Sequence, residues 1–356
     1  MGKKLMKCTD LAPGYSISRV IKGGWQLAGG HGQVDQAQAL EDMRRFVEAG
    51  MTTFDCADIY TGVEELIGCF LKDYRAAFLS GNLPAVQVHT KYVPDLSELS
   101  KLTSGHIEET IDRSLRRLGV ERLDLVQFHW WDFEVKGYVE AAMRLNDLRV
   151  AGKIRHIGLT NFDAAHLREI LDAGVPIISN QVQYSVLDNR PGADLAGMKE
   201  ERGVKLLAYG TAAGGLLSER WLGKPDPCRG PFENRSLVKY RLIIEEWGGW
   251  TLFQELLTVL KRIGERYGAG IADVAIRLIM QKPAAAAVIV GARDSRHLDR
   301  LRRLESFDLD DEDKAAISLV LSQAKGPKGP VYALERDREG PHGRIMRYNL
   351  NHGENA

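Results

Sequence analysis

Short apolar runs recur eight times along the chain, and segments with helical periodicity separate them. Parallel strands that are covered by helices give this pattern, because both faces of each strand are buried. The alternation therefore predicts an α/β protein with eight strands, closed as a (β/α)8 TIM barrel, with long loops at the C-terminal face. The expected strands are residues 20–25, 52–55, 86–91, 123–129, 154–159, 177–181, 204–209 and 286–290.

Punctuating residues support the same alternation. Apolar residues at helical spacing follow Ser104, the expected N-cap, and stop at Gly119, the expected helix end. Two stretches break the rhythm, residues 72–84 and 214–250, and the second should reach the catalytic mouth as a lid or substrate wall. Four glycines precede strands, where helices often end in a left-handed residue: Gly50, Gly152, Gly174 and Gly203.

The domain organisation follows from the length of this pattern. We expect one barrel domain over residues 1–325 and a C-terminal tail over residues 326–356, in a chain of 356 residues. The tail is charged but carries aromatic residues such as Tyr332 and Tyr348. Its sequence leaves two alternatives open, a frayed terminus and an arm docked on the barrel or on a partner subunit.

Composition limits the classes of partner. Lys plus Arg equal Asp plus Glu at 48 each, so no global charge attracts nucleic acid or an anionic membrane. The longest apolar run, residues 284–290, is too short to span a bilayer, and neither an export signal nor a lipid anchor is expected. The four cysteines lack metal-site spacing, which favours inert thiols, no metal and a reducing, cytoplasmic setting. Small-molecule ligands are the expected partners, and the oligomeric state is left open.

Three polar residues each end one of the apolar runs. Asp55, Lys91 and His129 close the second, third and fourth expected strands, at spacings of 36 and 38 residues. Because the carboxyl ends of parallel strands meet at one face of a barrel, these side chains should share one crevice. Tyr60 follows Asp55 by five residues and should lie in the adjoining loop.

These residue types together suit proton transfer to a carbonyl oxygen. A phenol such as Tyr60 gives up its proton more readily beside a buried ammonium, and Lys91 is placed to supply one. A buried lysine needs a partner, and Asp55 is the nearest carboxylate. His129 can direct a ring nitrogen toward a substrate oxygen. Each residue alone has a structural explanation, and their conjunction predicts an active site.

At residues 54–68 the chain resembles the aldo-keto reductases, and the resemblance extends over about residues 20–307. The motif is Phe54-Asp55-x-Ala57-Asp58-x-Tyr60, followed by Glu64 and Gly68. Asp55, Tyr60, Lys91 and His129 match the catalytic tetrad of that family in order. The resemblance implies a barrel that binds a nicotinamide cofactor without a Rossmann domain.

The resemblance also implies a set of cofactor-binding residues. Gly24 and Trp25 match the turn near the cofactor, Gly210 and Thr211 stand where relatives have a Ser-Pro pair, and the segment after the eighth strand resembles the adenosine-phosphate segment. Its basic residues favour NADP(H), while NAD(H) stays possible. The implied residues are Gly24, Trp25, Thr160, Asn161, Gln181, Tyr209, Gly210, Thr211, Gly291, Arg293, His297 and Arg300.

The resulting interpretation is an NADP-dependent reductase of aldehydes or ketones. Trp25, Trp130 and Trp131 are the expected substrate-pocket residues, and the identity of the carbonyl substrate is left open. Two other classes remain as alternatives at this stage. One is a cofactor-binding regulatory subunit with little turnover, and the other is an aldolase that uses Lys91 as a Schiff-base nucleophile.

Overall fold

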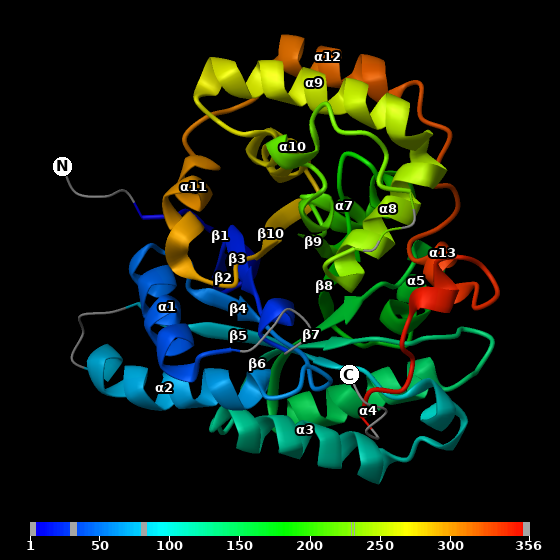
Figure 1. Ribbon diagram of the computed structural model, residues 1–356. Helices are drawn as coiled ribbons and strands as arrows, with labels where there is room; N and C mark the ends of the chain where they lie inside the picture. The colour runs from blue at the N-terminus through cyan, green and yellow to red at the C-terminus, as the bar shows by residue number, and fades with distance from the viewer. Residues whose placement is uncertain (1–4, 29–33, 80–83, 229, 231, 352–356) are drawn as a thin grey trace.

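Eight parallel strands close into a barrel in the computed structural model, which describes residues 5–28, 34–79, 84–228, 230 and 232–351 (Figure 1). The order around the barrel is β10-β3-β4-β5-β6-β7-β8-β9, so each strand lies beside its neighbours in sequence. Every expected strand is present, with ends that differ from the expected ones by two residues at most. The strands are β3 (Val20–Gly23), β4 (Thr53–Asp55), β5 (Gln87–Tyr92), β6 (Leu123–Phe128), β7 (Ile154–Thr160), β8 (Ile177–Gln183), β9 (Lys205–Tyr209) and β10 (Ala285–Gly291).

Helices surround the barrel and alternate with its strands, which confirms the (β/α)8 architecture (Figure 1). They are α1 (Gln36–Glu48), α2 (Val63–Leu79), α3 (Ser104–Leu118), α4 (Tyr138–Val150), α5 (Ala164–Asp172), α6 (Arg190–Asp194), α7 (Met198–Arg202), α8 (Arg235–Trp247), α9 (Gly249–Tyr267), α10 (Ile271–Met280), α11 (Leu298–Arg303), α12 (Asp311–Leu321) and α13 (Ala333–Arg336).

The predicted helix ends are confirmed, and one predicted helix N-cap is wrong by one residue. Gly119 ends α3 in the left-handed conformation at φ 63°, and the four glycines before strands all have positive φ. The N-cap of α3 is Thr103 and not Ser104, because the Thr103 hydroxyl accepts a hydrogen bond from the backbone N–H of His106. Helix α2 continues through Leu79, into the first stretch expected to be irregular, whose residues 80–83 lie outside the described part.

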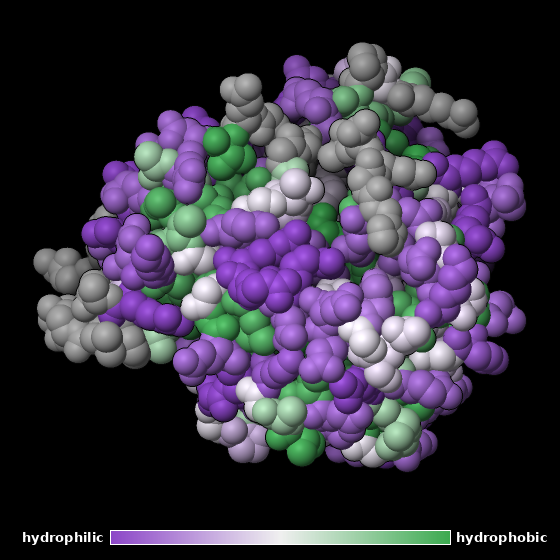
Figure 2. Space-filling model, turned by 90° about the horizontal axis from the view of Figure 1, so that it is seen from below, coloured by the Kyte–Doolittle hydropathy of each residue, from purple (hydrophilic) through white to green (hydrophobic). Residues whose placement is uncertain are grey.

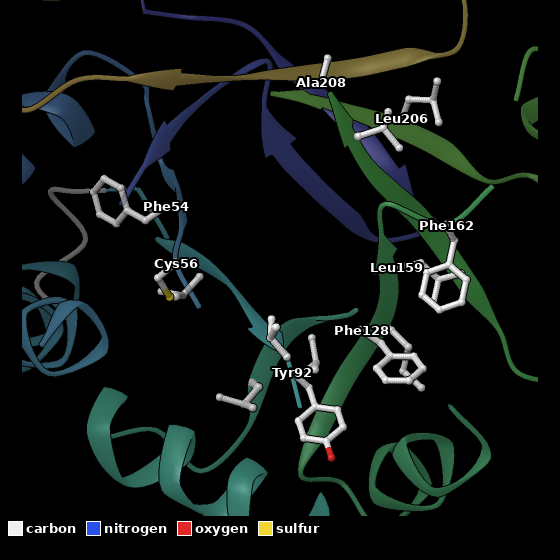
Figure 3. Close-up of a cluster of buried hydrophobic side chains, with 14 of the residues drawn as sticks. Phe54, Cys56, Tyr92, Phe128, Leu159, Phe162, Leu206 and Ala208 are labelled. Carbon is white, nitrogen blue, oxygen red and sulfur yellow. The ribbon is translucent and has the colours of Figure 1, made fainter. Parts of the chain in front are cut away.

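The outward-facing residues of the strands form the main core with the surrounding helices. Figure 3 shows Phe54, Tyr92, Phe128 and Leu159 among these buried side chains. Because side chains alternate along a strand, the residues next to them in sequence face the barrel axis. This alternation turns Asp55 and Lys91 inward, at the carboxyl end of the barrel.

An unpredicted hairpin covers the other end of the barrel. Strands β1 (Cys8–Ala12) and β2 (Tyr15–Ser18) pair antiparallel, and their apolar residues form a cluster with Ile21, Leu125 and Leu207. The Tyr15 hydroxyl lies 3.0 Å from Nε2 of His89, which β5 directs into the barrel. The amino end of the barrel is therefore closed.

The helices, the surface and the polar side chains give three further facts. None of the helices in the described residues is long and apolar enough to cross a membrane. The face in Figure 2 is mainly hydrophilic, with apolar side chains scattered in small groups. In the described ranges, no group of His, Cys, Asp or Glu is arranged to hold a metal ion.

The tail residues 326–351 lie on the barrel, so the docked alternative is the one the structure shows. Tyr348 accepts a hydrogen bond from the backbone N–H of Leu96 through its carbonyl oxygen, at 2.9 Å. Asp95 accepts hydrogen bonds from the backbone N–H groups of Leu350 and Asn351. The tail thus runs beside the loop that follows β5, at the carboxyl end of the barrel.

Candidate active site

A cavity of about 530 Å³ opens at the carboxyl ends of the strands. This volume lies in the range of small-molecule sites. Asp55, Tyr60, Lys91 and His129 all line it, together with residues of the β9 loop, of α8 and of the tail. The structure therefore brings the four predicted catalytic side chains to one wall of one cavity.

Asp55 is the anchor of this wall. Its Oδ2 accepts a hydrogen bond from Nζ of Lys91 at 2.7 Å, and both side chains are buried. Its Oδ1 accepts hydrogen bonds from the amides of Gln127 at 2.9 Å and Gln181 at 2.6 Å. Lys91 also donates to the carbonyl oxygen of Cys56 at 2.7 Å. This network fixes the ammonium group rigidly, and Gln127 is a member that the sequence did not single out.

Tyr60 lies against Lys91. The ammonium nitrogen is 5.1 Å from the centre of the phenol ring, and the edge of Trp25 packs on the same ring at 5.1 Å. Burial raises the pKa of Tyr60, and Lys91 offsets part of that rise, so the net shift is upward. Burial by itself would lower the pKa of Lys91, but Asp55 and Tyr60 outweigh it and keep the ammonium protonated. Lys91 lowers the pKa of Tyr60 as expected, but burial raises that pKa by a larger amount.

Polar side chains hold the loop that carries Tyr60. The Asp58 carboxyl accepts backbone N–H groups of Ile59 at 3.0 Å and Val93 at 3.1 Å, and burial raises its pKa to about 8. Arg117 donates to the Asp58 carbonyl at 3.1 Å and pairs with buried Glu64 at 3.3 Å. These contacts tie the Tyr60 loop to the end of β5, which explains the acidic residues of the motif.

His129 is neutral and presents one free nitrogen. Its Nδ1 lies 3.1 Å from the carbonyl oxygen of Thr160, which only accepts, so Nδ1 carries the proton. Burial, together with the nearby Arg336 guanidinium, lowers the pKa of His129 to about 3. Nε2 is buried and has no hydrogen-bond partner among the described residues. This nitrogen is therefore an acceptor, able to bind a hydroxyl.

Buried neutral histidines make stability depend on pH. Burial lowers the pKa of His89 to about 3, below the usual histidine pKa of about 6.5, so the unfolded chain binds more protons between these values. Stability contributed by His89 is then present above pH 6.5 and is lost as the pH falls. We expect His89→Gln to reduce the loss of unfolding free energy between pH 7 and pH 5 by about 2 kcal/mol.

Urea denaturation of both proteins at the two pH values measures this difference. Each protein serves as its own reference, so a constant loss of stability in the variant does not affect the result. Equal pH dependence in the two proteins would show that His89 takes up its proton as readily in the folded chain as in the unfolded one.

Most of the predicted cofactor residues line the cavity. Two do not: Gly24 and Arg293 are absent from its wall. Gly24 is instead a packing residue, since a side chain there would meet the Asp55 carbonyl oxygen at 2.7 Å. The residues that line the cavity are Trp25, Thr160, Asn161, Gln181, Tyr209, Gly210, Thr211, Gly291, His297 and Arg300.

The polar side chains expected to hold a nicotinamide carboxamide already make some hydrogen bonds to one another. Thr160 donates its hydroxyl to the carbonyl oxygen of Gln181 at 3.1 Å, and Tyr209 donates its hydroxyl to Oδ1 of Asn161 at 2.9 Å. The amide nitrogen of Asn161 makes no hydrogen bond in the described part of the chain, so it stays available for an acceptor. The flat ring of Tyr209, held by this bond, suits stacking on an aromatic ring.

The far end of the cavity suits phosphate groups. Four of the residues between 210 and 215 have a positive φ, which is 73° at Gly210, 49° at Ala213, 64° at Gly214 and 101° at Gly215. Left-handed backbone of this kind can turn N–H groups toward an anion. Arg300 and His297 add basic side chains. Arg300 donates Nε to the buried Asp273 at 2.6 Å, and its terminal nitrogens make no hydrogen bond within the described residues. A nicotinamide dinucleotide therefore fits the donors present.

One predicted pocket residue was wrong. Trp130 is fully buried outside the barrel, where its Nε1 donates to the carbonyl oxygens of Asp132 and Val135. Alternation at the end of β6 explains the error, because His129 faces the cavity and its successor must face away. Trp131 does line the cavity, with its ring edge-on to His129 at 4.3 Å.

The structure confirms that the stretch 214–250 reaches the mouth of the cavity, although the sequence did not single out the residues that α8 and the tail contribute. Helix α8 lies within the long stretch 214–250, and Lys239 from it lines the cavity with Tyr332 from the tail. The Tyr332 ring contacts the His129 ring edge-on at 5.6 Å. Neither residue belongs to a motif, and the signals in the sequence were the irregular stretch 214–250 and the aromatic content of the tail.

Comparison with known proteins agrees with this geometry. The model of the aldo/keto reductase family matches residues 19–321. The aldo-keto reductase YhdN of Bacillus subtilis is 27% identical over 346 residues, covering 94% of this chain and 99% of the relative. The NADH-specific methylglyoxal reductase of Escherichia coli is 26% identical and covers 78% of this chain and 86% of its own.

A solved structure shares the fold. The glycerol dehydrogenase AKR11B4 from Gluconobacter oxydans superimposes with a TM-score of 0.74 at 22% identity, and the match covers 93% of this chain and 99% of that one. Neither the regulatory subunit nor the aldolase is favoured by these relatives. The chain therefore belongs to the aldo/keto reductase family and is an oxidoreductase that uses a nicotinamide cofactor to reduce carbonyl compounds.

Proposed function

We propose that the chain reduces an aldehyde or ketone with NADPH, using Tyr60 as the proton donor. The observation that carries this proposal is the contact of Tyr60 with Lys91, whose ammonium is locked by Asp55, on the wall of the cavity. The bound nicotinamide supplies the hydride that the carbonyl carbon receives. The protein supplies the proton, the orientation of the substrate and a site that excludes water.

Three residues of the tetrad have separate roles in proton transfer. Tyr60 gives its phenolic proton to the oxygen that becomes the alcohol. Lys91 stabilises the phenolate that forms, because its ammonium is held against the ring. Asp55 keeps Lys91 protonated and in place, and the amides of Gln127 and Gln181 keep Asp55 in place.

His129 orients the substrate as an acceptor. Since Nδ1 is committed to the Thr160 carbonyl oxygen, Nε2 accepts a hydrogen bond from a hydroxyl, either that of the alcohol or one beside the carbonyl. Polarisation of the carbonyl then depends on Tyr60 alone. This assignment narrows the role that the sequence predicted for His129.

NADPH is the proposed cofactor because Arg300 and His297 lie at the phosphate end of the cavity. We expect Arg300→Ala to weaken NADPH binding about tenfold or more, since a charge-assisted hydrogen bond contributes about 1.5–3 kcal/mol. NADH lacks the 2′-phosphate. If Arg300 acts only on that phosphate, the affinity of Arg300→Ala for NADH should differ from that of the wild type by less than about twofold. Fluorescence titration with both cofactors measures the two affinities.

The matched control for this test is Arg302→Ala. Arg302 belongs to the same helix but pairs with the exposed Asp299 at 3.1 Å, and it does not line the cavity. Equal weakening of NADPH and NADH by Arg300→Ala would show that the residue does not read the phosphate. One relative is NADH-specific by name, which makes this comparison necessary.

The function itself is tested with a panel of carbonyl compounds and each cofactor, followed at the nicotinamide absorbance. Simple aldehydes, sugars, ring ketones and pyridoxal-like aldehydes form the panel. Steady turnover with NADPH supports the proposal. Tight cofactor binding without turnover on any compound would contradict it. A cytoplasmic location, proposed from the cysteine pattern, is tested separately by cell fractionation.

A further inference from the structure

Buried ion pairs hold the tail at the mouth of the cavity. Glu335 on α13 is 1% exposed and pairs with Lys239 of α8 at 3.3 Å and with Arg190 at 3.4 Å. Arg190 in turn pairs with buried Asp188 at 2.7 Å. Burial by itself would raise the pKa of Glu335, but Lys239 and Arg190 lower it to about 2. The four charges balance, so α13 has a fixed position.

The next residue, Arg336, contacts the carboxyl ends of two barrel strands from outside the cavity. Its Nη2 donates to the carbonyl oxygens of Asn161 at 2.8 Å and Trp130 at 3.2 Å, and its Nη1 donates to that of Val331 at 3.2 Å. The guanidinium stacks on the Phe133 ring at 4.0 Å. All of its hydrogen bonds in the described part of the chain go to backbone carbonyl oxygens. The guanidinium therefore stabilises the positions of these three backbone segments.

Two of those carbonyls belong to residues beside the active site. Trp130 directly follows His129 at the end of β6, and Asn161 directly follows Thr160 at the end of β7. Arg336 therefore bridges the ends of two neighbouring strands from outside the cavity. The Thr160 carbonyl, which holds Nδ1 of His129, is one residue away from this bridge.

Asn161 needs such support because its backbone is left-handed, with φ 62°. A residue other than glycine adopts this region at an energetic cost, even though asparagine tolerates it best. Three hydrogen bonds hold the residue: its N–H to the Gln181 carbonyl at 2.8 Å, its Oδ1 from Tyr209, and its carbonyl from Arg336. Removing Arg336 leaves the carbonyl oxygen of Asn161 without that donor.

We propose that Arg336 is a positioning residue of the active site, which fixes His129 and Asn161 by bridging the carbonyl oxygens of Trp130 and Asn161. The proposal rests on the proposed function of the cavity. It assigns the tail a part in the reaction, although Arg336 itself is not among the cavity-lining residues. Its loss should impair the nicotinamide half of the site and leave the adenosine half intact.

The test compares Arg336→Ala with the control Arg344→Ala. Arg344 lies in the same tail, but its side chain is 68% exposed and, among the described residues, forms an ion pair with exposed Glu339 alone, at 3.7 Å. We expect Arg336→Ala to lower kcat about 10² fold, the effect of a misplacement of about 1 Å in an active site. NADPH binding should weaken, while binding of adenosine 2′,5′-bisphosphate, which has no nicotinamide, should stay within about twofold.

Two further measurements separate positioning from folding. Guanidinium at millimolar concentration should restore part of the activity of Arg336→Ala and none of the activity of an inactive Tyr60→Phe variant. Arg336→Lys keeps the charge but loses the planar guanidinium, whose two terminal nitrogens reach three carbonyl oxygens, so its kcat should fall between those of the wild type and the alanine variant. This variant also serves if Arg336→Ala does not fold.

The outcomes against the proposal are distinct. Wild-type kcat and NADPH affinity in folded Arg336→Ala or Arg336→Lys would overturn it. Equal loss of adenosine bisphosphate binding would also overturn it, because the damage would then be general. If the wild type reduces none of the carbonyl compounds, the proposed function fails. If the wild type is active and the Arg336 variants are equally active, the proposed function stands and this inference alone fails.

Discussion

Replacing Tyr60 by phenylalanine should lower kcat by about 10² to 10⁴ fold, the contribution typical of a general acid. The change removes only the hydroxyl, so the ring contact with Trp25 and the ion pair of Lys91 with Asp55 remain. Cofactor binding should therefore stay within about twofold of the wild type if the general acid acts only in the chemical step. Steady-state kinetics and fluorescence titration with NADPH measure the two effects.

The matched control for this variant is Tyr74→Phe. The Tyr74 hydroxyl donates to the Pro84 carbonyl oxygen at 2.9 Å, away from the cavity. Its loss should leave kcat unchanged. Undiminished turnover in Tyr60→Phe would remove Tyr60 from the role of proton donor, and a parallel loss in Tyr74→Phe would point to general destabilisation.

Lys91→Met should abolish turnover and also destabilise the fold. Without the ammonium, the phenolate of Tyr60 loses its stabilising charge, and the Asp55 carboxylate is left buried with only the two amides of Gln127 and Gln181. Breaking a buried ion pair on one side typically costs about 3–5 kcal/mol. Thermal or urea denaturation measures the loss of stability, and the nicotinamide absorbance measures turnover.

The double variant Asp55→Asn with Lys91→Met separates the two consequences. It removes the unpaired charge, so it should recover part of the lost stability and none of the activity. Activity in the double variant, or an unchanged denaturation midpoint in Lys91→Met, would contradict the assignment of Lys91 as the ion that holds Asp55 and activates Tyr60.

The barrel and the tetrad were predictable because their signals are local. Each strand is a compact apolar run, and each of Asp55, Lys91 and His129 marks the place where such a run meets the cavity. The helix end at Gly119 was equally local, since a positive φ favours glycine. Trp130 was misplaced because alternation reverses at every residue, and the expected strand end differed from the actual one by a single residue.

The stretch 214–250 was correctly expected to reach the cavity, but the contacts that α8 makes with the tail were not predictable from local pattern, because the partners are far apart in sequence. Glu335 pairs with Arg190 across 145 residues, and Arg336 reaches Asn161 across 175 residues. An isolated Glu-Arg pair in a charged segment gives no sign of such burial. The β1–β2 hairpin was missed for a related reason: its apolar residues find their partners inside the barrel.

The docked tail has a consequence for how the enzyme comes into being. On the ribosome, all eight barrel strands and the four tetrad residues are synthesised before Tyr332 and Arg336. A nascent or prematurely terminated polypeptide that stops before residue 331 thus contains every recognisable family motif, yet it lacks part of the wall around the bound substrate. Searching genomes for the motif alone would score such a truncated product as intact.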